Sequence, residues 1–146
     1  MKSLKHSGFT LLEVIISLGI FCTLTSLAVY NLKDYQARCE EQVALAWFKN
    51  SLKSAYNQGY LKKHATKIII DHNRIIFDTT ASDNRFERHN ERTLPKTLTL
   101  IGKNNYQVYS SGQSGPITWT FESSLTHHKY IYKVQMGWGE IFESKT

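Results

Sequence analysis

Cysteine and proline are scarce in this chain, which has two of each among 146 residues. Cys22 and Cys39 are 17 positions apart in the sequence. On one continuous helix this spacing separates them by about 25 Å, whereas a disulfide needs Cα atoms within about 7 Å. Neither residue belongs to a CxxC motif or to a cysteine–histidine pattern with metal-ligand spacing. We therefore expect no disulfide within the chain, and we interpret both residues as buried, inert thiols.

The residue patterns of an enzyme are also missing. No Ser-His-Asp, Cys-His or nucleophile-elbow spacing is visible, and the glycine loop at residues 112–115 lacks the lysine and helix start of a phosphate-binding loop. His127 and His128 are adjacent, so they face apart on a helix or a strand, whereas a zinc site needs three or four convergent ligands. We therefore expect neither an enzyme nor a metal or cofactor, and we predict a turn at the glycine loop.

Charge is moderate, and the formal net charge of +6 comes without a dense basic patch. We predict a polar loop over residues 79–92, whose basic residues are Arg85, Arg88, Arg92 and His89. Together with Phe86, the three arginines are candidate DNA contacts, because arginine and aromatic side chains can hold single strands by charge and stacking. Glu87 and Glu91 nearly balance the local charge, and they favour a solvated loop instead.

One long apolar run covers residues 9–30, and Glu13 is its only charged residue. About 18 or more mostly apolar residues can cross a bilayer as a helix. Lys2 and Lys5 precede the run, so the positive-inside bias places its N-terminal side in the cytoplasm. The run predicts a transmembrane helix preceded by a basic leader, residues 1–8. Glu13 is costly there, because a charged side chain at the bilayer centre costs about 2.5–3.5 kcal/mol on insertion scales.

Three interpretations of this segment compete. A signal peptide would be cut after the apolar run, where residues 26–28 offer small side chains at suitable offsets, but the run is long for this role and contains an acid. A plain signal anchor would keep the whole segment. A leader cut before the run would leave the helix attached, and Gly8 and Phe9, with Glu13 four residues further on, favour this third interpretation.

The residues around this third cut read Lys5-His6-Ser7-Gly8-Phe9-Thr10-Leu11-Leu12-Glu13. They resemble the prepilin cleavage motif of type IV pilins and pseudopilins at every one of these positions. The resemblance implies that a prepilin peptidase cuts between Gly8 and Phe9 and methylates the new amine of Phe9. It also implies that Thr10, Leu11, Leu12 and Glu13 serve assembly.

The position of Glu13 suits such a role. After the cut, Phe9 carries an amine at the head of the helix, and Glu13 follows one helical turn later. In lipid an ion pair offsets much of the cost of a carboxylate, and a neighbouring subunit can supply its own Phe9 amine. The alternative is a protonated Glu13 that makes a local hydrogen bond.

From residue 31 the chain becomes polar but keeps helical spacing. The apolar residues at i, i+3 and i+4 steps are Leu45, Phe48, Leu52, Ala55, Tyr56 and Gly59. No proline interrupts residues 9–64, so we predict one helix from Phe9 to about Tyr60, roughly 78 Å long. Residues 31–62 are its amphipathic extension.

Residues 63–146 predict a head of antiparallel strands. Strand-like segments lie at residues 67–70, 74–77, 97–100, 106–109, 117–121 and 130–134, with a last apolar segment at 137–142. The first two flank a short turn and predict a hairpin. We expect an α+β, type IV pilin-like fold, in which the long helix packs on one face of a small antiparallel sheet and the other face is solvated.

A weaker resemblance concerns the end of the chain. The segment Tyr132-Lys133-Val134-Gln135-Met136-Gly137-Trp138-Gly139 is similar to the tail of the D-type minor competence pseudopilins of Gram-positive bacteria, and Thr93-Leu94-Pro95 is similar to the same group. Tyr30 replaces the helix-kinking proline of many major pilins, and the head lacks their paired cysteines. Both departures favour a minor subunit.

These resemblances imply a minor pseudopilin of a competence pilus, which serves binding or import of external DNA during transformation. Its partners would be other major and minor pseudopilins, a prepilin peptidase, an assembly ATPase with its membrane platform protein, membrane lipid, and DNA only weakly or indirectly. The N-terminus would be cytoplasmic and the head would lie at the cell surface or in the wall after assembly. A pseudopilin of a type II-like secretion system is the alternative, and a membrane-anchored DNA-binding receptor is an alternative of another class.

Overall fold

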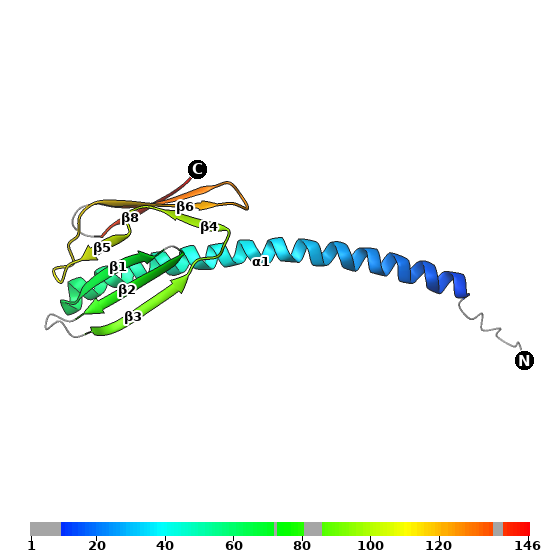
Figure 1. Ribbon diagram of the computed structural model, residues 1–146, viewed down its shortest axis with the longest axis horizontal. Coiled ribbons are helices and arrows are strands. Elements are labelled where there is room, and N and C mark those ends of the chain that lie inside the picture. Colours follow the sequence, from blue (N-terminus) through cyan, green and yellow to red (C-terminus); the bar gives the residue numbers. More distant parts are fainter. Residues whose placement is uncertain (1–9, 72, 81–85, 136–138) are drawn as a thin grey trace, which may run out of the picture. The chain divides into compact units, whose positions relative to one another are not determined.

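The computed structural model describes residues 10–71, 73–80, 86–135 and 139–146, apart from the side chains of residues 30, 31 and 86–88. The chain divides into two compact units, Met1–Gln36 and Ala37–Thr146. The first contains the N-terminal part of helix α1, and the second contains the rest of α1 with the head (Figure 1).

Helix α1 spans Leu11–Lys62, in agreement with the predicted single helix. It begins after Thr10, whose hydroxyl oxygen accepts a hydrogen bond from the Glu13 backbone N–H at 3.3 Å. Its end is set by Lys63, which has a left-handed φ of 59°, a conformation that commonly follows the last helical turn. The helix therefore has a defined start and stop.

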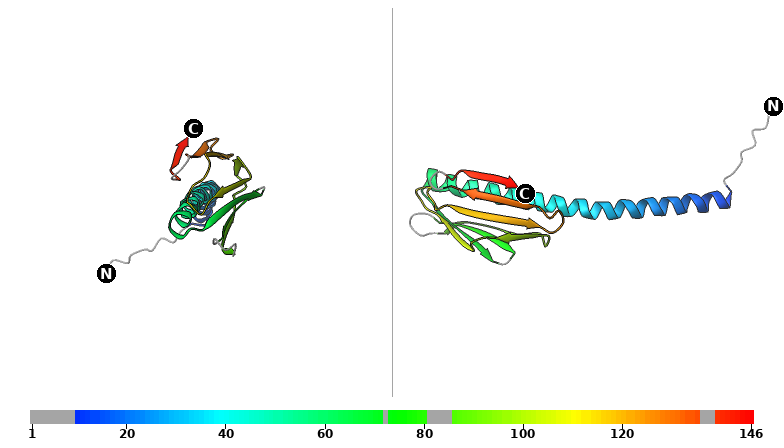
Figure 2. Two further views of the ribbon diagram at one scale, coloured as in Figure 1. Left: turned by 90° about the vertical axis from the view of Figure 1, so that its left-hand side faces the viewer. Right: turned by 90° about the horizontal axis from the view of Figure 1, so that it is seen from above.

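The head contains eight strands in two antiparallel sheets. They are β1 (Ala65–Asp71), β2 (Arg74–Thr80), β3 (Phe86–Thr93), β4 (Leu98–Ile101), β5 (Asn105–Val108), β6 (Ile117–Ser123), β7 (Lys129–Val134) and β8 (Ile141–Lys145). One sheet has the order β3-β2-β1-β5 and the other β4-β6-β7-β8, and they lie on different sides of the C-terminal part of α1 (Figure 2). The predicted hairpin and antiparallel strands are confirmed, but the single small sheet becomes two, because β5 returns to pair with β1 while β4 pairs with β6.

Strand β3 corrects the predicted loop over residues 79–92. Its sequence lacks an alternating apolar pattern, and it is held instead by pairing with β2, in which His89 lies opposite Asp78 and Asn90 opposite Phe77. The Asn90 side-chain amide also donates a hydrogen bond to the Ser51 hydroxyl of α1 at 3.1 Å. β3 is an edge strand, and charged residues on an edge discourage pairing with other chains.

The core of the head lies between the C-terminal part of α1 and the inner faces of both sheets. Phe48 is fully buried, with its ring centroid 6.1 Å from Phe77 of β2, 5.3 Å from Trp119, 4.9 Å from Phe121 and 5.6 Å from Tyr132. The predicted apolar stripe of the helix is confirmed as core, because its members Leu45, Phe48, Leu52, Ala55 and Tyr56 are all buried.

The end of α1 fits closely against the turn before β6. A Cβ atom on Gly59 would lie 2.7 Å from the Tyr109 carbonyl oxygen, and Gly112 adopts a φ of +75° with its Cα against the Tyr60 backbone. Both positions require glycine, the first for space and the second for its left-handed backbone. The predicted turn at the glycine loop is thereby confirmed.

The two cysteines are free. Cys39 is partly exposed, so its expected burial is wrong. Cys22 is exposed on the apolar part of α1, the predicted transmembrane helix, where lipid and not protein would cover it.

Candidate functional site

The first turn of α1 is the described part of the predicted processing and assembly site. Gly8 and Phe9 lie outside the described residues. Thr10 occupies the N-cap position and Glu13 the third helical position, which is the Thr-x-x-Glu order of a capping box. A carboxylate in the first turn also interacts favourably with the helix dipole. The sequence carried this capping signal, and our sequence reasoning did not use it.

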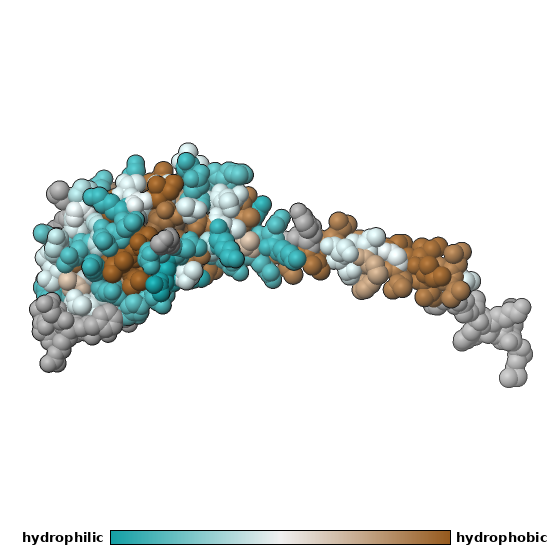
Figure 3. Space-filling view, viewed as in Figure 1, coloured by the Kyte–Doolittle hydropathy of each residue, from teal (hydrophilic) through white to brown (hydrophobic). Residues whose placement is uncertain are grey.

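The surface of α1 from Leu11 to Val29 is apolar and uncovered (Figure 3). Leu11 is 79% exposed, Phe21 64% and Leu27 65%. Among the described residues, α1 is the one helix long and apolar enough to cross a membrane, and none of its apolar window is buried. In water such a surface is unfavourable, so it requires lipid or other helices around it.

Hydroxyl groups within this apolar segment are paired with the backbone. The Thr23 hydroxyl donates to the Ile20 carbonyl oxygen at 2.8 Å, and the Ser26 hydroxyl donates to that of Cys22 at 2.8 Å. Polar groups in the hydrocarbon region of a bilayer need partners of this kind. The threonine and serine residues are therefore compatible with a transmembrane position.

Within the described residues, the structure separates two of the candidate DNA-contact arginines, Arg88 and Arg92, from His89. Arg85 lies outside the described residues. Arg88 and Arg92 occupy alternate positions of β3, in phase with Asn90, whose side chain reaches α1. His89 and Glu91 have the opposite phase. Positions 88 and 92 thus lie on one face of the edge strand β3 and His89 lies on the other. The strand therefore separates basic residues that the sequence suggested as one group.

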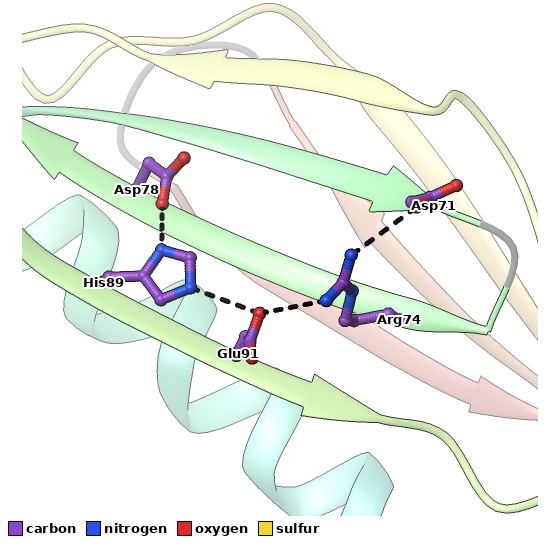
Figure 4. Close-up of polar contacts among 5 residues, drawn as sticks. All are labelled: Asp71, Arg74, Asp78, His89 and Glu91. Atoms are coloured by element: carbon purple, nitrogen blue, oxygen red, sulfur yellow. Dashed lines mark hydrogen bonds and ion pairs between the residues drawn. The ribbon is translucent and has the colours of Figure 1, made fainter.

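The outer face of the β1–β2–β3 strands carries a network of five charged or titratable side chains (Figure 4). His89 Nδ1 lies 2.6 Å from Asp78 Oδ1, and its Nε2 lies 3.2 Å from Glu91 Oε2. Arg74 lies 3.7 Å from both Glu91 and Asp71. Both ring nitrogens of His89 are engaged, so the network links β2 to β3, and its three carboxylates outnumber its two basic groups.

This geometry changes the proton affinity of the histidine. Hydrogen bonds to Asp78 and then to Glu91 raise the pKa of His89 above its usual value of 6.5. Imidazolium can donate from both nitrogens at once, whereas neutral imidazole can donate from one. Protonation therefore strengthens the link between β2 and β3.

One carboxylate of the head is buried. Glu41 of α1 is 2% exposed, and both of its oxygens lie close to the Ser123 hydroxyl, at 3.0 and 2.8 Å. The Ser123 oxygen in turn accepts hydrogen bonds from the backbone N–H groups of Leu125 and Thr126 at 3.2 Å. Glu41 thereby anchors the β6–β7 turn to the helix. The sequence contained a signal for the burial of Glu41, because Glu41 is four residues before Leu45 and therefore lies on the same, apolar face of the helix.

A second polar group joins the end of α1 to the loop before β6. The Tyr56 hydroxyl lies 2.5 Å from the Ser114 hydroxyl and 3.0 Å from that of Tyr106. Burial raises the pKa of Tyr56 well above its usual range, so its hydroxyl keeps its proton. This group fixes the loop and offers no nucleophile.

No group of three or more histidine, cysteine, aspartate or glutamate side chains within the described ranges is arranged to hold a metal ion. The described residues do present an exposed apolar part of α1, an N-cap at the start of that helix, and a sheet face on which acidic and basic side chains pair with one another. These features suit association with lipid and with other polypeptides.

The His89 network should make stability depend on pH. Because the folded-state pKa of His89 is raised, its contribution is fully present below the unfolded pKa, about 6.5, and is lost as pH rises through the folded pKa. We expect His89→Gln to lower the melting temperature by more at roughly pH 6, where His89 is more protonated, than at roughly pH 8. Thermal denaturation followed by circular dichroism measures this difference.

The matched control is His128→Gln, which removes an exposed histidine that has no carboxylate partner among the described residues. Its melting temperature should follow wild type at both pH values. A His89→Gln difference that stays constant with pH would contradict a protonation-dependent link.

Comparison with known proteins gives two findings. Residues 3–29 match the family described as the prokaryotic N-terminal methylation motif. The solved structure of the minor pseudopilin EpsH from the Type 2 Secretion System of Vibrio cholerae is similar to this chain, with a TM-score of 0.60 and 18% identity, over 72% of this chain and 96% of that one. Comparison with curated protein sequences finds no significant match. The chain thus carries a prepilin-type methylation motif at its start, and it has the pilin-like fold of EpsH.

Proposed function

We propose that this chain is a minor pseudopilin, a structural subunit that is held in the membrane by α1 and assembled with similar subunits. The observation that carries the proposal is the continuity of one helix, which begins within the methylation motif, runs through an uncovered apolar segment and ends inside a head with the EpsH fold. An uncovered apolar segment joined to a folded head is the form that a membrane-held assembly subunit needs.

Processing is the first step of this role. We propose that a prepilin peptidase cuts between Gly8 and Phe9 and methylates the amine of Phe9. The capped start of α1 is compatible with this site, because Thr10, the N-cap residue, directly follows Phe9 in the sequence. Lys2 and Lys5 favour a cytoplasmic N-terminus, and the head would then lie on the outer side of the membrane.

Glu13 would drive assembly in this proposal. Its carboxylate has no ion-pair partner in the described part of the chain, and its neighbours Leu11 and Leu12 are exposed. In lipid the cost of this charge favours a partner, and the Phe9 amine of an adjacent subunit has the required sign. Thr10, Leu11 and Leu12 would contribute the contact surface around that pair.

Two cargoes fit the proposed role. The resemblance of residues 132–139 and 93–95 to D-type competence pseudopilins favours DNA uptake, and we propose this as the function. The likeness to EpsH, a pseudopilin of a type II secretion system, favours protein secretion as the second candidate. A receptor that binds DNA through Arg85, Arg88 and Arg92 has less support, because β3 places His89 in the opposite phase to Arg88 and Arg92.

The expected partners are the same for DNA uptake and for protein secretion. They would be other major and minor pseudopilins, the prepilin peptidase, an assembly ATPase with its platform protein in the membrane, and lipid around α1. DNA would be met by the assembled filament, and by this subunit weakly or indirectly.

Processing can be tested directly on the protein extracted from membranes of its own cells. We expect intact-mass and N-terminal peptide spectrometry to show that residues 1–8 are lost and that Phe9 carries one methyl group. Gly8→Val should retain the leader, because a bulky side chain replaces the glycine at the cut. A wild-type protein that keeps its leader would contradict the pseudopilin proposal.

Glu13 can be tested with two substitutions that separate its charge from its place in the capping box. Glu13→Gln removes the charge but keeps a side chain that capping boxes accept, whereas Glu13→Val removes both the charge and the polar side chain. Both variants keep the backbone N–H that bonds to the Thr10 hydroxyl. We expect both variants to insert in the membrane and both to be lost from sheared filaments, measured by immunoblotting of membrane and filament fractions. Thr10→Ala is the matched control, because it weakens the cap by about 0.5–2 kcal/mol and leaves the carboxylate in place.

Filament incorporation of Glu13→Gln at the wild-type level would contradict the ion pair. In that case the function of Glu13 would be helix capping.

The cargo can be decided in a strain that lacks this chain. We expect transformation by added DNA to fall by orders of magnitude while the set of secreted proteins stays unchanged, and a plasmid copy should restore transformation. Normal transformation with a loss of secreted proteins would favour the second candidate.

A further inference from the structure

A shallow groove of about 660 Å³ lies at one end of the β4-β6-β7-β8 sheet, where β6 begins and β7 ends. Ile117 and Val134 are register partners on the inner face of this sheet, where they belong to the buried core, whereas Thr118 and Lys133 alternate with them and are exposed on the outer face. Phe142 of β8 pairs with Lys133, borders the groove and is 45% exposed. A side chain that entered the groove from the outer face would therefore meet one exposed aromatic ring.

Two lysines border the same groove. Lys133 is the register partner of both Thr118 and Phe142, and Lys103 approaches from the turn after β4. No carboxylate is among the described residues that line the groove. Neither lysine makes an ion pair in the described part of the head, whereas Lys129 of the same sheet pairs with Glu122 at 3.7 Å. The groove thus combines one exposed aromatic ring with two positive charges that have no ion-pair partner in the described part of the head.

We propose that this groove binds an acidic segment of a neighbouring protein subunit. An apolar side chain of that segment would pack against Phe142, while its carboxylates would pair with Lys103 and Lys133. That the segment belongs to a neighbouring subunit rests on the proposed function. That it is acidic follows from the two lysines of the groove.

Two other occupants fit the groove less well. A nucleic acid is bound through a row of cations along its backbone and several stacking rings, and this groove offers two lysines and one ring. A second copy of the chain carries the same formal net charge of +6, and the carboxylates of its opposite sheet face already pair with Arg74 and His89 (Figure 4). Charge complementarity therefore favours a different, acidic partner.

The test uses the full chain in detergent micelles and three fluorescent probes. They are a peptide with glutamates and aspartates around a Leu-Phe pair, the same peptide with lysines in place of the acids, and a short oligothymidylate. We expect fluorescence anisotropy to show binding of the acidic peptide alone. The double variant Lys103→Glu/Lys133→Glu should weaken that binding by roughly tenfold or more, because two attractions become repulsions.

Further variants separate the two parts of the groove. Phe142→Ala should weaken binding while the dependence on salt stays as in wild type, whereas Lys103→Gln/Lys133→Gln should reduce that dependence. Lys96→Glu makes the same charge change at an exposed lysine outside the groove and should leave affinity unchanged. Near-ultraviolet circular dichroism checks that each variant keeps the wild-type fold.

Three results would overturn the proposal. They are absence of acidic-peptide binding by the folded protein, oligothymidylate binding that the lysine variants abolish, and self-association in light scattering that Lys133→Glu abolishes. The peptide assay needs neither leader processing nor filament assembly. An uncut leader would therefore refute the proposed role without touching this groove, and a failed peptide assay would leave that role standing.

Discussion

The packing of Phe48 against aromatic rings from both sheets is the contact on which the head depends. Phe77 approaches from one sheet, and Trp119 and Phe121 approach from the other. Truncation of a buried phenylalanine costs about 3–5 kcal/mol, which is a large share of the roughly 5–15 kcal/mol that stabilises a domain. Each sheet uses the helix as its inner layer, so the head cannot form without the C-terminal part of α1. This ties a folded head to a helix whose other part is uncovered.

The start of α1 brings two demands together at one residue. As the third helical residue, Glu13 donates its backbone N–H to the Thr10 hydroxyl, and its carboxylate lies in the first turn, at the positive end of the helix dipole. As a carboxylate in an apolar, uncovered segment, it carries a solvation cost in lipid that capping does not remove. The proposed ion pair with a neighbouring subunit addresses the second demand. The two functions are compatible, because the backbone N–H of Glu13 serves the cap while the carboxylate stays available.

Much of the fold could be predicted from the sequence, because α1 and most strands carry their own periodicity. β3 could not, since its pairing with β2 and the Asn90–Ser51 hydrogen bond take the place of an alternating apolar pattern. The division into two sheets depends on β5 returning to β1, a pairing distant in sequence that no local pattern encodes. Of the site, the Thr10–Glu13 cap was readable, whereas the separation of Arg92 from His89 follows from strand phase and required β3 to be recognised first.

Surface charge distinguishes the two outer faces of the head. On the β3-β2-β1-β5 sheet, three carboxylates surround Arg74 and His89, so this network keeps a negative charge. On the other sheet, Lys103 and Lys133 border a groove beside the exposed ring of Phe142, and neither has an ion-pair partner in the described part of the chain. A pilin-like fold does not by itself choose its neighbours, because fold and binding specificity are separate properties. Specificity in this head therefore has to come from side chains that the fold leaves unpaired, and in the described part of the chain the groove beside Phe142 brings two such cations together.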